Sequence, residues 1–256
     1  MMRQTGGRRV LVRSNCGRGL AAAASLLAGG LLAAACSSGS SSTATTAASG
    51  ATTSTSTAAS GGGSSSGLTS LVNGVSKSSG ATFSATYLVT QASTGKSQTV
   101  TFAQSPPKSA IITPNGSFYI DATSITECQG SGSTATCTTL PSSMSSIVSG
   151  LTNLVSPTTI VSDLKGVEAQ AAAHSAGYVI STSSATYGGL ASNCVTAKGT
   201  SEPTPVTYCG STSNGVLTYV NADGNTVTLQ SYSANPPAST FAPPAGAVVK
   251  TVPVGA

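Results

Sequence analysis

The stretch Ala81-Thr-Phe-Ser-Ala-Thr-Tyr-Leu-Val89 has an apolar residue at every odd position and mostly polar residues at the even ones. A period of two is typical of a β-strand that buries one face. Similar short runs follow at 98–104, 109–113, 117–121 and 124–128, and residues of the Gly, Pro and Asn types separate them. The pattern therefore predicts a meander of antiparallel strands.

The period changes after Pro141, where apolar residues begin to recur at helical spacing. These residues are Met144, Ile147, Val148, Leu151, Leu154 and Val155. All six fall on one face of a helix that is predicted to begin near Pro141. A second, weaker helical stretch runs over 157–173, and Gly177 then returns the chain to strands.

The carboxyl-terminal part again shows short strand-like runs, at 178–182, 193–197, 206–209, 216–220 and 226–232. Strands, then two helices, then strands is the order of an α+β fold. The apolar stripes of the helices need a partner, and the apolar face of a bent sheet is the only large surface available. We therefore expect one β-rich domain over 67–256 with the helices on the sheet.

The amino terminus is typical of an export signal. All five arginines precede residue 19, and an apolar run of 17 residues follows at 19–35. A transmembrane helix needs about 20 apolar residues, and here the run is followed by Ser and Gly rather than by charges. Residues 1–35 are therefore predicted to be a signal peptide, with the general and the twin-arginine export routes both open, since Arg8 and Arg9 are adjacent.

Cys36 follows Leu32-Ala33-Ala34-Ala35, which resembles the lipobox of bacterial lipoproteins. The match departs from the usual pattern at Ala33, where a large aliphatic residue is expected. The resemblance implies that Cys36 is acylated and anchors the protein to the extracytoplasmic face of the cell membrane, since two acyl chains give stable attachment. The alternative is a coincidental cysteine near the cleavage site of a secreted protein.

Residues 37–66 consist only of Ser, Thr, Ala and Gly. No side chain among them is large enough to offset the entropy of ordering the segment. Residues 36–66 are therefore predicted to be the acylated cysteine and a flexible tether, either bare or carrying O-linked sugars.

Charge and composition exclude several classes of function. Beyond residue 18 the chain has six lysines and six acidic residues, so its net charge there is 6 − 6 = 0. No basic patch remains for nucleic acid. The carboxylates are scattered singly, the one histidine is His174, and no GxSxG or phosphate-binding motif occurs. We therefore expect no enzyme activity and no cofactor, with His174 as a helix cap or surface residue.

Four cysteines remain after Cys16 leaves with the signal and Cys36 takes lipid. Cys128 and Cys137 bracket a Gly-rich hairpin in which they fall opposite each other, and Cys194 and Cys209 bracket a Pro-containing loop in the same way. An even number of cysteines in an oxidising compartment favours disulfides, here 128 with 137 and 194 with 209. A metal site is not expected, because CxxC spacing is absent.

Several short pieces together resemble secreted actinobacterial lipoproteins related to the LolA and LppX class of lipoprotein and lipid carriers. They include Phe83-Ser-Ala-Thr-Tyr87, the Cys128 to Cys137 hairpin, Tyr208-Cys209 and Phe241-Ala-Pro-Pro-Ala-Gly246, and the likeness spans 68–247. The resemblance implies a curved, unclosed antiparallel half-barrel whose concave face is covered by the helices. It also implies an apolar cavity between sheet and helices that holds acyl chains.

These observations favour a monomeric, membrane-anchored protein that binds a hydrophobic ligand, such as a lipid, an acyl chain or a lipoglycan, without catalysis. The candidate cavity residues are Phe83, Tyr87, Val89, Phe102, Ile120, Met144, Val148 and Leu151. The alternative for these residues is that they close on one another as an ordinary core. The alternative function is a non-ligand interaction module, either a scaffold or a sensor resembling the anti-sigma partner RseB.

Overall fold

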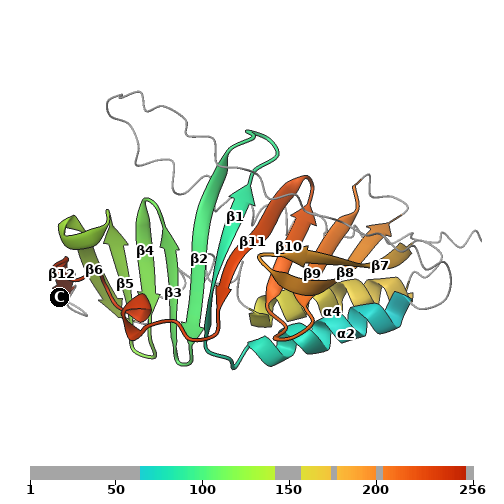
Figure 1. Cartoon of the computed structure of the whole chain (residues 1–256), viewed down its shortest axis with the longest axis horizontal. Coiled ribbons are helices and arrows are strands. Elements are labelled where there is room, and N and C mark those ends of the chain that lie inside the picture. The colour runs from blue at the N-terminus through green and yellow to red at the C-terminus, as the bar shows by residue number, and fades with distance from the viewer. Residues whose placement is uncertain (1–63, 142–156, 174–177, 200–203, 252–256) are drawn as a thin grey trace, which may run out of the picture.

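The computed structural model describes residues 64–141, 157–173, 178–199 and 204–251. They form a single open sheet of 12 strands with two helices packed against it (Figure 1). The strand order is β12-β6-β5-β4-β3-β2-β1-β11-β10-β9-β8-β7, and every pairing is antiparallel except the parallel pairing of β12 with β6. The predicted α+β class with a curved, unclosed sheet is confirmed.

The amino-terminal strands are β1 (Phe83–Thr90), β2 (Ser97–Ser105), β3 (Lys108–Thr113), β4 (Gly116–Ile120), β5 (Ser124–Gln129) and β6 (Thr136–Pro141). The carboxyl-terminal strands are β7 (Tyr178–Tyr187), β8 (Leu190–Gly199), β9 (Val206–Ser211), β10 (Leu217–Ala222), β11 (Asn225–Ser233) and β12 (Val248–Thr251). The helices are α2 (Ser64–Ser78) and α4 (Pro157–Ala173), with short 3-10 turns η1 (Gly132–Thr134) and η4 (Ala238–Phe241).

The two described helices are not the pair that the sequence predicts. Helix α4 has the bounds expected for the second helix, whereas the first expected helix, at 141–155, lies beyond Pro141, outside the described residues. Helix α2 was not predicted, although Leu68, Leu71, Val72 and Val75 follow helical spacing. It begins at Ser64, inside the segment predicted to be tether.

One face of the sheet carries the main core. Strand registers place Val89, Val227, Val220, Tyr208 and Val195 on one ladder across β1, β11, β10, β9 and β8, so these side chains share a face. Helices α2 and α4 lie side by side on this face over β7, β8 and β9 (Figure 1). Their apolar stripes pack there into a cluster of buried residues: Leu68, Leu71, Val72, Val75, Ile160, Leu164, Val195, Tyr208 and Leu217.

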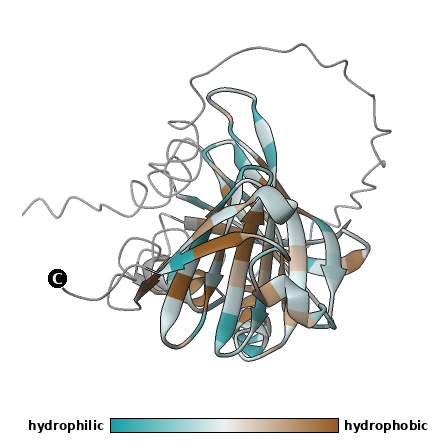
Figure 2. Cartoon of the chain, turned by 90° about the vertical axis from the view of Figure 1, so that its left-hand side faces the viewer, coloured by the Kyte–Doolittle hydropathy of each residue, from teal (hydrophilic) through white to brown (hydrophobic). Residues whose placement is uncertain are grey.

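A second cluster continues along the same face over β1 to β3 and the neighbouring β11. Its buried members are Phe83, Ala85, Tyr87, Val100, Phe102, Ile111, Val216 and Leu229. The ring of Phe83 lies 5.9 Å from that of Phe102 in an edge arrangement and 6.0 Å from that of Tyr232 in a stacked one. Figure 2 shows the corresponding alternation, with brown hydrophobic segments within the strands and teal segments at many of the turns.

The opposite face holds both disulfides, which join Cys128 to Cys137 and Cys194 to Cys209, the two pairs that the loop spacings predict. In each case the cysteines are directly opposed on neighbouring strands, with 4.0 Å between their Cα atoms. Near β2 and β3 this face is covered by η4, and Phe241 packs against the cluster that contains the first disulfide. Neither described helix is long and apolar enough to cross a membrane.

Candidate functional site

A groove runs along the side of α2 where the helix meets β7, β8, β9 and the loop before β10. It consists of two adjoining pockets of about 560 and 380 Å³ that share Ser66, Ser70 and Asn193. We call it the α2 groove. The larger pocket is lined by Ser66, Thr69, Ser70, Leu71, Asn73, Gly74, Val75, Lys77, Asn193, Gly210, Ser211, Thr212 and Gly215, and the smaller one by Ser66, Gly67, Ser70, Thr182, Ser183, Ser184, Asn193, Cys194 and Val195.

Glycines on both sides allow α2 to lie close to the sheet. A Cβ atom at Gly215 would collide with the carbonyl group of Gly74 on the helix, and Gly215 also has a positive φ of 71°. A Cβ at Gly210 would lie 2.6 Å from Cδ1 of Leu71. Because no side chain separates the two backbones at these points, α2 lies directly against the strands there.

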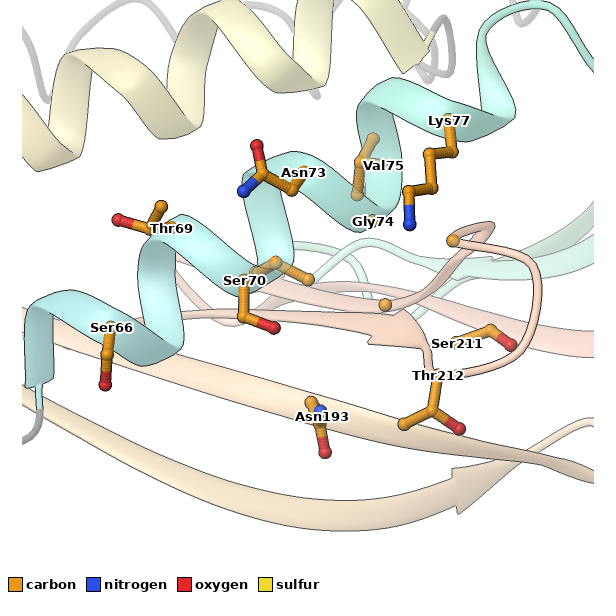
Figure 3. Close-up of a pocket in the computed structure, with 13 residues that line it drawn as sticks. Ser66, Thr69, Ser70, Asn73, Gly74, Val75, Lys77, Asn193, Ser211 and Thr212 are labelled. Carbon is orange, nitrogen blue, oxygen red and sulfur yellow. The ribbon is translucent and has the colours of Figure 1, made fainter.

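The groove is lined by hydroxyl and amide groups. In Figure 3 Ser66, Ser70 and Lys77 point from α2 toward the strands, while Asn193 and Thr212 lie on the opposite wall. Ser66, Ser70, Lys77, Asn193 and Thr212 are all exposed residues. Lys77 is the only charged residue among those that line the groove.

Hydrogen bonds at the margins hold the walls in place. The hydroxyl of Thr69 donates to a carboxylate oxygen of Glu168 at 2.6 Å and so ties α2 to α4. Thr212 donates its hydroxyl to the carbonyl of Ala191 at 3.2 Å, and its N–H donates to the same carbonyl at 3.0 Å. The Thr212 wall is therefore fixed to the first residues of β8, which favours a preformed site.

The chemistry of this lining suits reversible binding through hydrogen bonds. Hydroxyl groups donate and accept, the amide of Asn193 does both, and the ammonium group of Lys77 supplies three donors. Carboxylate and imidazole groups are absent from the described residues that line the groove, and Lys77 is its one charged group. Among the described residues no three His, Cys, Asp or Glu side chains gather as metal ligands.

The predicted cavity residues lie elsewhere, on the face of β1 to β4. Phe83, Tyr87 and Phe102 are 2 to 4% exposed and pack together in one cluster, and Val89 is partly buried against it. Ile120, on β4, is half-buried and is not part of that cluster. The other three predicted residues, Met144, Val148 and Leu151, lie outside the described residues.

Tyr87 shows how closely this cluster is packed. Its hydroxyl donates to the carbonyl of Leu217 at 3.0 Å, and burial, with a smaller contribution from Tyr232, raises the pKa of its phenol well above the usual value. The buried O–H group is therefore satisfied by protein. Phe83, Tyr87 and Phe102 are therefore members of one packed cluster. The predicted cavity also needs Met144, Val148 and Leu151, which lie outside the described residues, so it stays a prediction.

Sequence reasoning did not find the α2 groove. The available signal was local: between Leu68 and Val75 one side of the helix is apolar, which leaves Ser66, Ser70 and Lys77 on another side. Nothing in the sequence indicates that Asn193 and Thr212 face them. Two further candidate residues, Cys36 and His174, lie outside the described residues, so acylation of Cys36 stays a prediction.

Comparison with known proteins assigns no family to this chain. No protein-family model matches the chain, and no curated protein matches it. Among solved structures, the crystal structure of MucB matches with a TM-score of 0.45 and 9% identity over 73% of this chain, and the crystal structure of MucB in complex with MucA(peri) with 0.42 and 9% over 72%. A structure of PNGF-II matches with 0.32 and 9% over 67% of this chain and 31% of its own.

The matched part spans 65% of the MucB chain, and 62% in the complex, which is less than two thirds of its length. Such low identities carry no family, ligand or partner over to this protein. The resemblance to the LolA and LppX class stays a sequence-based prediction.

Proposed function

We propose that this protein is a non-catalytic, extracytoplasmic binding module that holds a polar ligand in the α2 groove and is anchored to the membrane through acylated Cys36. The observation that carries the proposal is the groove itself, a preformed hollow lined by exposed hydroxyl and amide groups beside a fully packed core. Preformed hollows with a few convergent polar groups are the usual sites of small-ligand binding.

The composition of the groove supports a ligand held by hydrogen bonds. Ser66, Ser70 and Asn193 line both pockets, so they form the centre of the groove. Lys77 lies at the end of α2 nearest to Thr212 and would favour a neutral or acidic group there. The walls are fixed from opposite sides by the bonds of Thr69 and Thr212, so little rearrangement is required on binding.

The test is a pair of matched variants on α2. Ser70→Trp places a large ring in the centre of the groove, whereas Ser76→Trp places the same ring at an exposed position of α2 that does not line it. The probes are neutral peptides, neutral and acidic oligosaccharides and a fatty acid, measured by calorimetry on the protein from residue 37 onward. We expect a polar probe to bind wild type and Ser76→Trp but not Ser70→Trp. Equal binding to the two variants would exclude the groove.

A hydrophobic ligand is the second candidate. The observation that favours it is that the apolar face of the sheet continues beyond the strands under α2 and α4 into β1 to β5, where Phe118 and Ile120 are only half-buried. Mass spectrometry of a solvent extract of the purified protein tests it, since a carrier retains lipid. Stoichiometric lipid in that extract supports this candidate, and an extract without lipid removes it.

The membrane anchor is tested separately. Cys36→Ala is expected to release the protein from the membrane fraction, because the two acyl chains are its only proposed attachment. The mature wild-type chain is expected to begin at Cys36 with the mass of the added lipid. A mature chain that begins elsewhere and carries no acyl mass would exclude the anchor without bearing on the groove.

A further inference from the structure

Strand β7 is a long edge strand of the sheet that the described residues form. It contains ten residues and, among the described strands, pairs only with β8. On its other side no strand of the described part of the chain pairs with its backbone N–H and C=O groups. Residues 181–184 are exposed along it, and Val179 is 64% exposed.

Proteins usually protect such an edge with charges, proline, a bulge or a short strand. β7 contains no charged residue and no proline, and its register with β8 runs without a shift from Tyr178 to Tyr187. The other edge strand, β12, is different: it has four residues and includes Lys250. Of the two edge strands in the described sheet, β7 is therefore the one that lacks these protective features, which suits an edge that pairs with another strand.

The smaller pocket of the α2 groove opens beside this edge. Thr182, Ser183 and Ser184 of β7 line it together with Ser66 and Ser70 of α2. Thr182 is paired with Val195, so its side chain is on the helix-covered face. In a strand added next to β7, every second side chain would lie on that face, directed toward the pocket.

We propose that β7 binds an extended, uncharged peptide segment of a partner protein as an additional strand, with alternate small polar side chains of the peptide in the smaller pocket. Main-chain hydrogen bonds would supply most of the affinity and the pocket the selectivity, as in other cases of strand addition. An uncharged segment is required because neither β7 nor the lining of this pocket offers a charge to pair with one. The proposal rests on the proposed function, since it assigns a ligand class to the α2 groove.

The experiment uses the protein from residue 37 onward and an array of uncharged ten-residue peptides that vary two alternate positions. The strongest binder is then made as two N-methylated peptides, one methylated at its odd backbone amides and the other at its even ones. The peptide that loses the N–H groups facing β7 is expected to bind about tenfold or more weakly, whereas the peptide that loses the N–H groups on its other side should bind as before. Hydrogen exchange of residues 178–187 is expected to slow in the complex.

Two single-residue variants test the edge from the side of the protein. Successive N–H groups of a strand point in opposite directions, so one of Ala185→Pro and Thr186→Pro removes a bond to β8 and the other affects only the outer edge, and neither residue lines the smaller pocket. The variant that keeps the melting temperature is the edge variant. We expect it to lose peptide affinity by about tenfold or more, as Ser70→Trp does.

The outcomes separate the two proposals. Peptide binding that is unchanged in the edge variant but lost in Ser70→Trp overturns strand addition and leaves the groove. Failure of every peptide in the array overturns strand addition, whatever polar ligand the groove takes. If no peptide binds but the protein self-associates, and the edge variant abolishes that self-association, the peptide proposal is overturned as well. The edge then pairs with a second copy of the protein.

Discussion

The hairpins β5–β6 and β8–β9 use the same chemistry in different surroundings. Each has a disulfide between opposed cysteines on the face away from the helices. Two positions along in each hairpin, a pair of threonines shares a 2.9 Å hydrogen bond, Thr126 with Thr139 and Thr196 with Thr207. The surroundings differ, because β8–β9 lies under α2, whereas Phe241 of the carboxyl-terminal segment packs near the first disulfide.

The difference shows that the covalent bond sets strand pairing but not what covers the sheet. Both hairpins are equally well clamped, and yet the groove adjoins only β8–β9, where Gly210 and Gly215 admit the helix. The candidate function therefore depends on the contact between α2 and the sheet. The predictions below measure how much this contact and the two disulfides each contribute to stability.

The largest loss of stability is expected at the close approach of Gly74 on α2 to Gly215 in the loop before β10. Gly215→Ala places a Cβ against the carbonyl group of Gly74 in a left-handed backbone, so α2 has to move. We expect the free energy of unfolding in urea to fall by more than about 3 kcal/mol. The control is Gly95→Ala, which has a similar φ of 65° but open space around the new atom, and should cost about 1 to 2 kcal/mol. Equal losses for the two variants would show that the close approach is unimportant.

Removing either disulfide is expected to cost less stability than Gly215→Ala, and the two losses should be nearly equal to each other. The two loops have sequence separations of 9 and 15 residues, and loop entropy assigns each bond about 3 kcal/mol, with slightly more for the longer loop. The variants replace Cys128 and Cys137, or Cys194 and Cys209, with serine pairs. Urea unfolding measures the cost, and hydrogen exchange of α2 is expected to quicken only in the second variant. Faster exchange of α2 in the first would mean that the two regions are coupled.

The smallest effect concerns the β4–β5 turn, in the part of the sheet that α2 and α4 do not cover. The carboxylate of Asp121 accepts the N–H groups of Thr123 and Ser124, each at 2.7 Å, and these bonds, that of Thr123 foremost, lower its pKa. A lowered pKa means that the folded state favours the charged form, so this stabilisation is present above the ordinary carboxyl pKa near 4 and is lost as pH falls through the folded pKa.

Asp121→Ala is therefore expected to lower stability at neutral pH by less than about 1 kcal/mol, because the group is mostly exposed. The difference from wild type should shrink when thermal unfolding is repeated at decreasing pH below 4. A difference that is constant with pH would mean that the carboxylate is not the stabilising group.

Much of the fold is predictable from local pattern. The alternation in 81–89 locates β1, and the apolar spacing after Pro157 locates α4, since each depends on neighbours within one turn or strand. The hairpin spacing of Cys128 and Cys137 is local in the same sense. Helix α2 was not predicted although its stripe from Leu68 to Val75 is visible, because its first turn lies in the Ser, Thr, Ala and Gly segment and the predicted domain begins only at residue 67.

The amino-acid sequence by itself determined most of the strands, α4, the two disulfide pairs and the lack of net charge beyond residue 18, because periodicity, loop length and composition are properties of short segments. It did not indicate β12 or its parallel pairing with β6. Only the tertiary structure decided that Phe83, Tyr87 and Phe102 fill their own core and that Ser70 faces Asn193. The physical reason is distance along the chain. The groove exists because α2 docks on strands more than a hundred residues later, through backbone contacts of glycines such as Gly74 and Gly215 that leave no periodic signal.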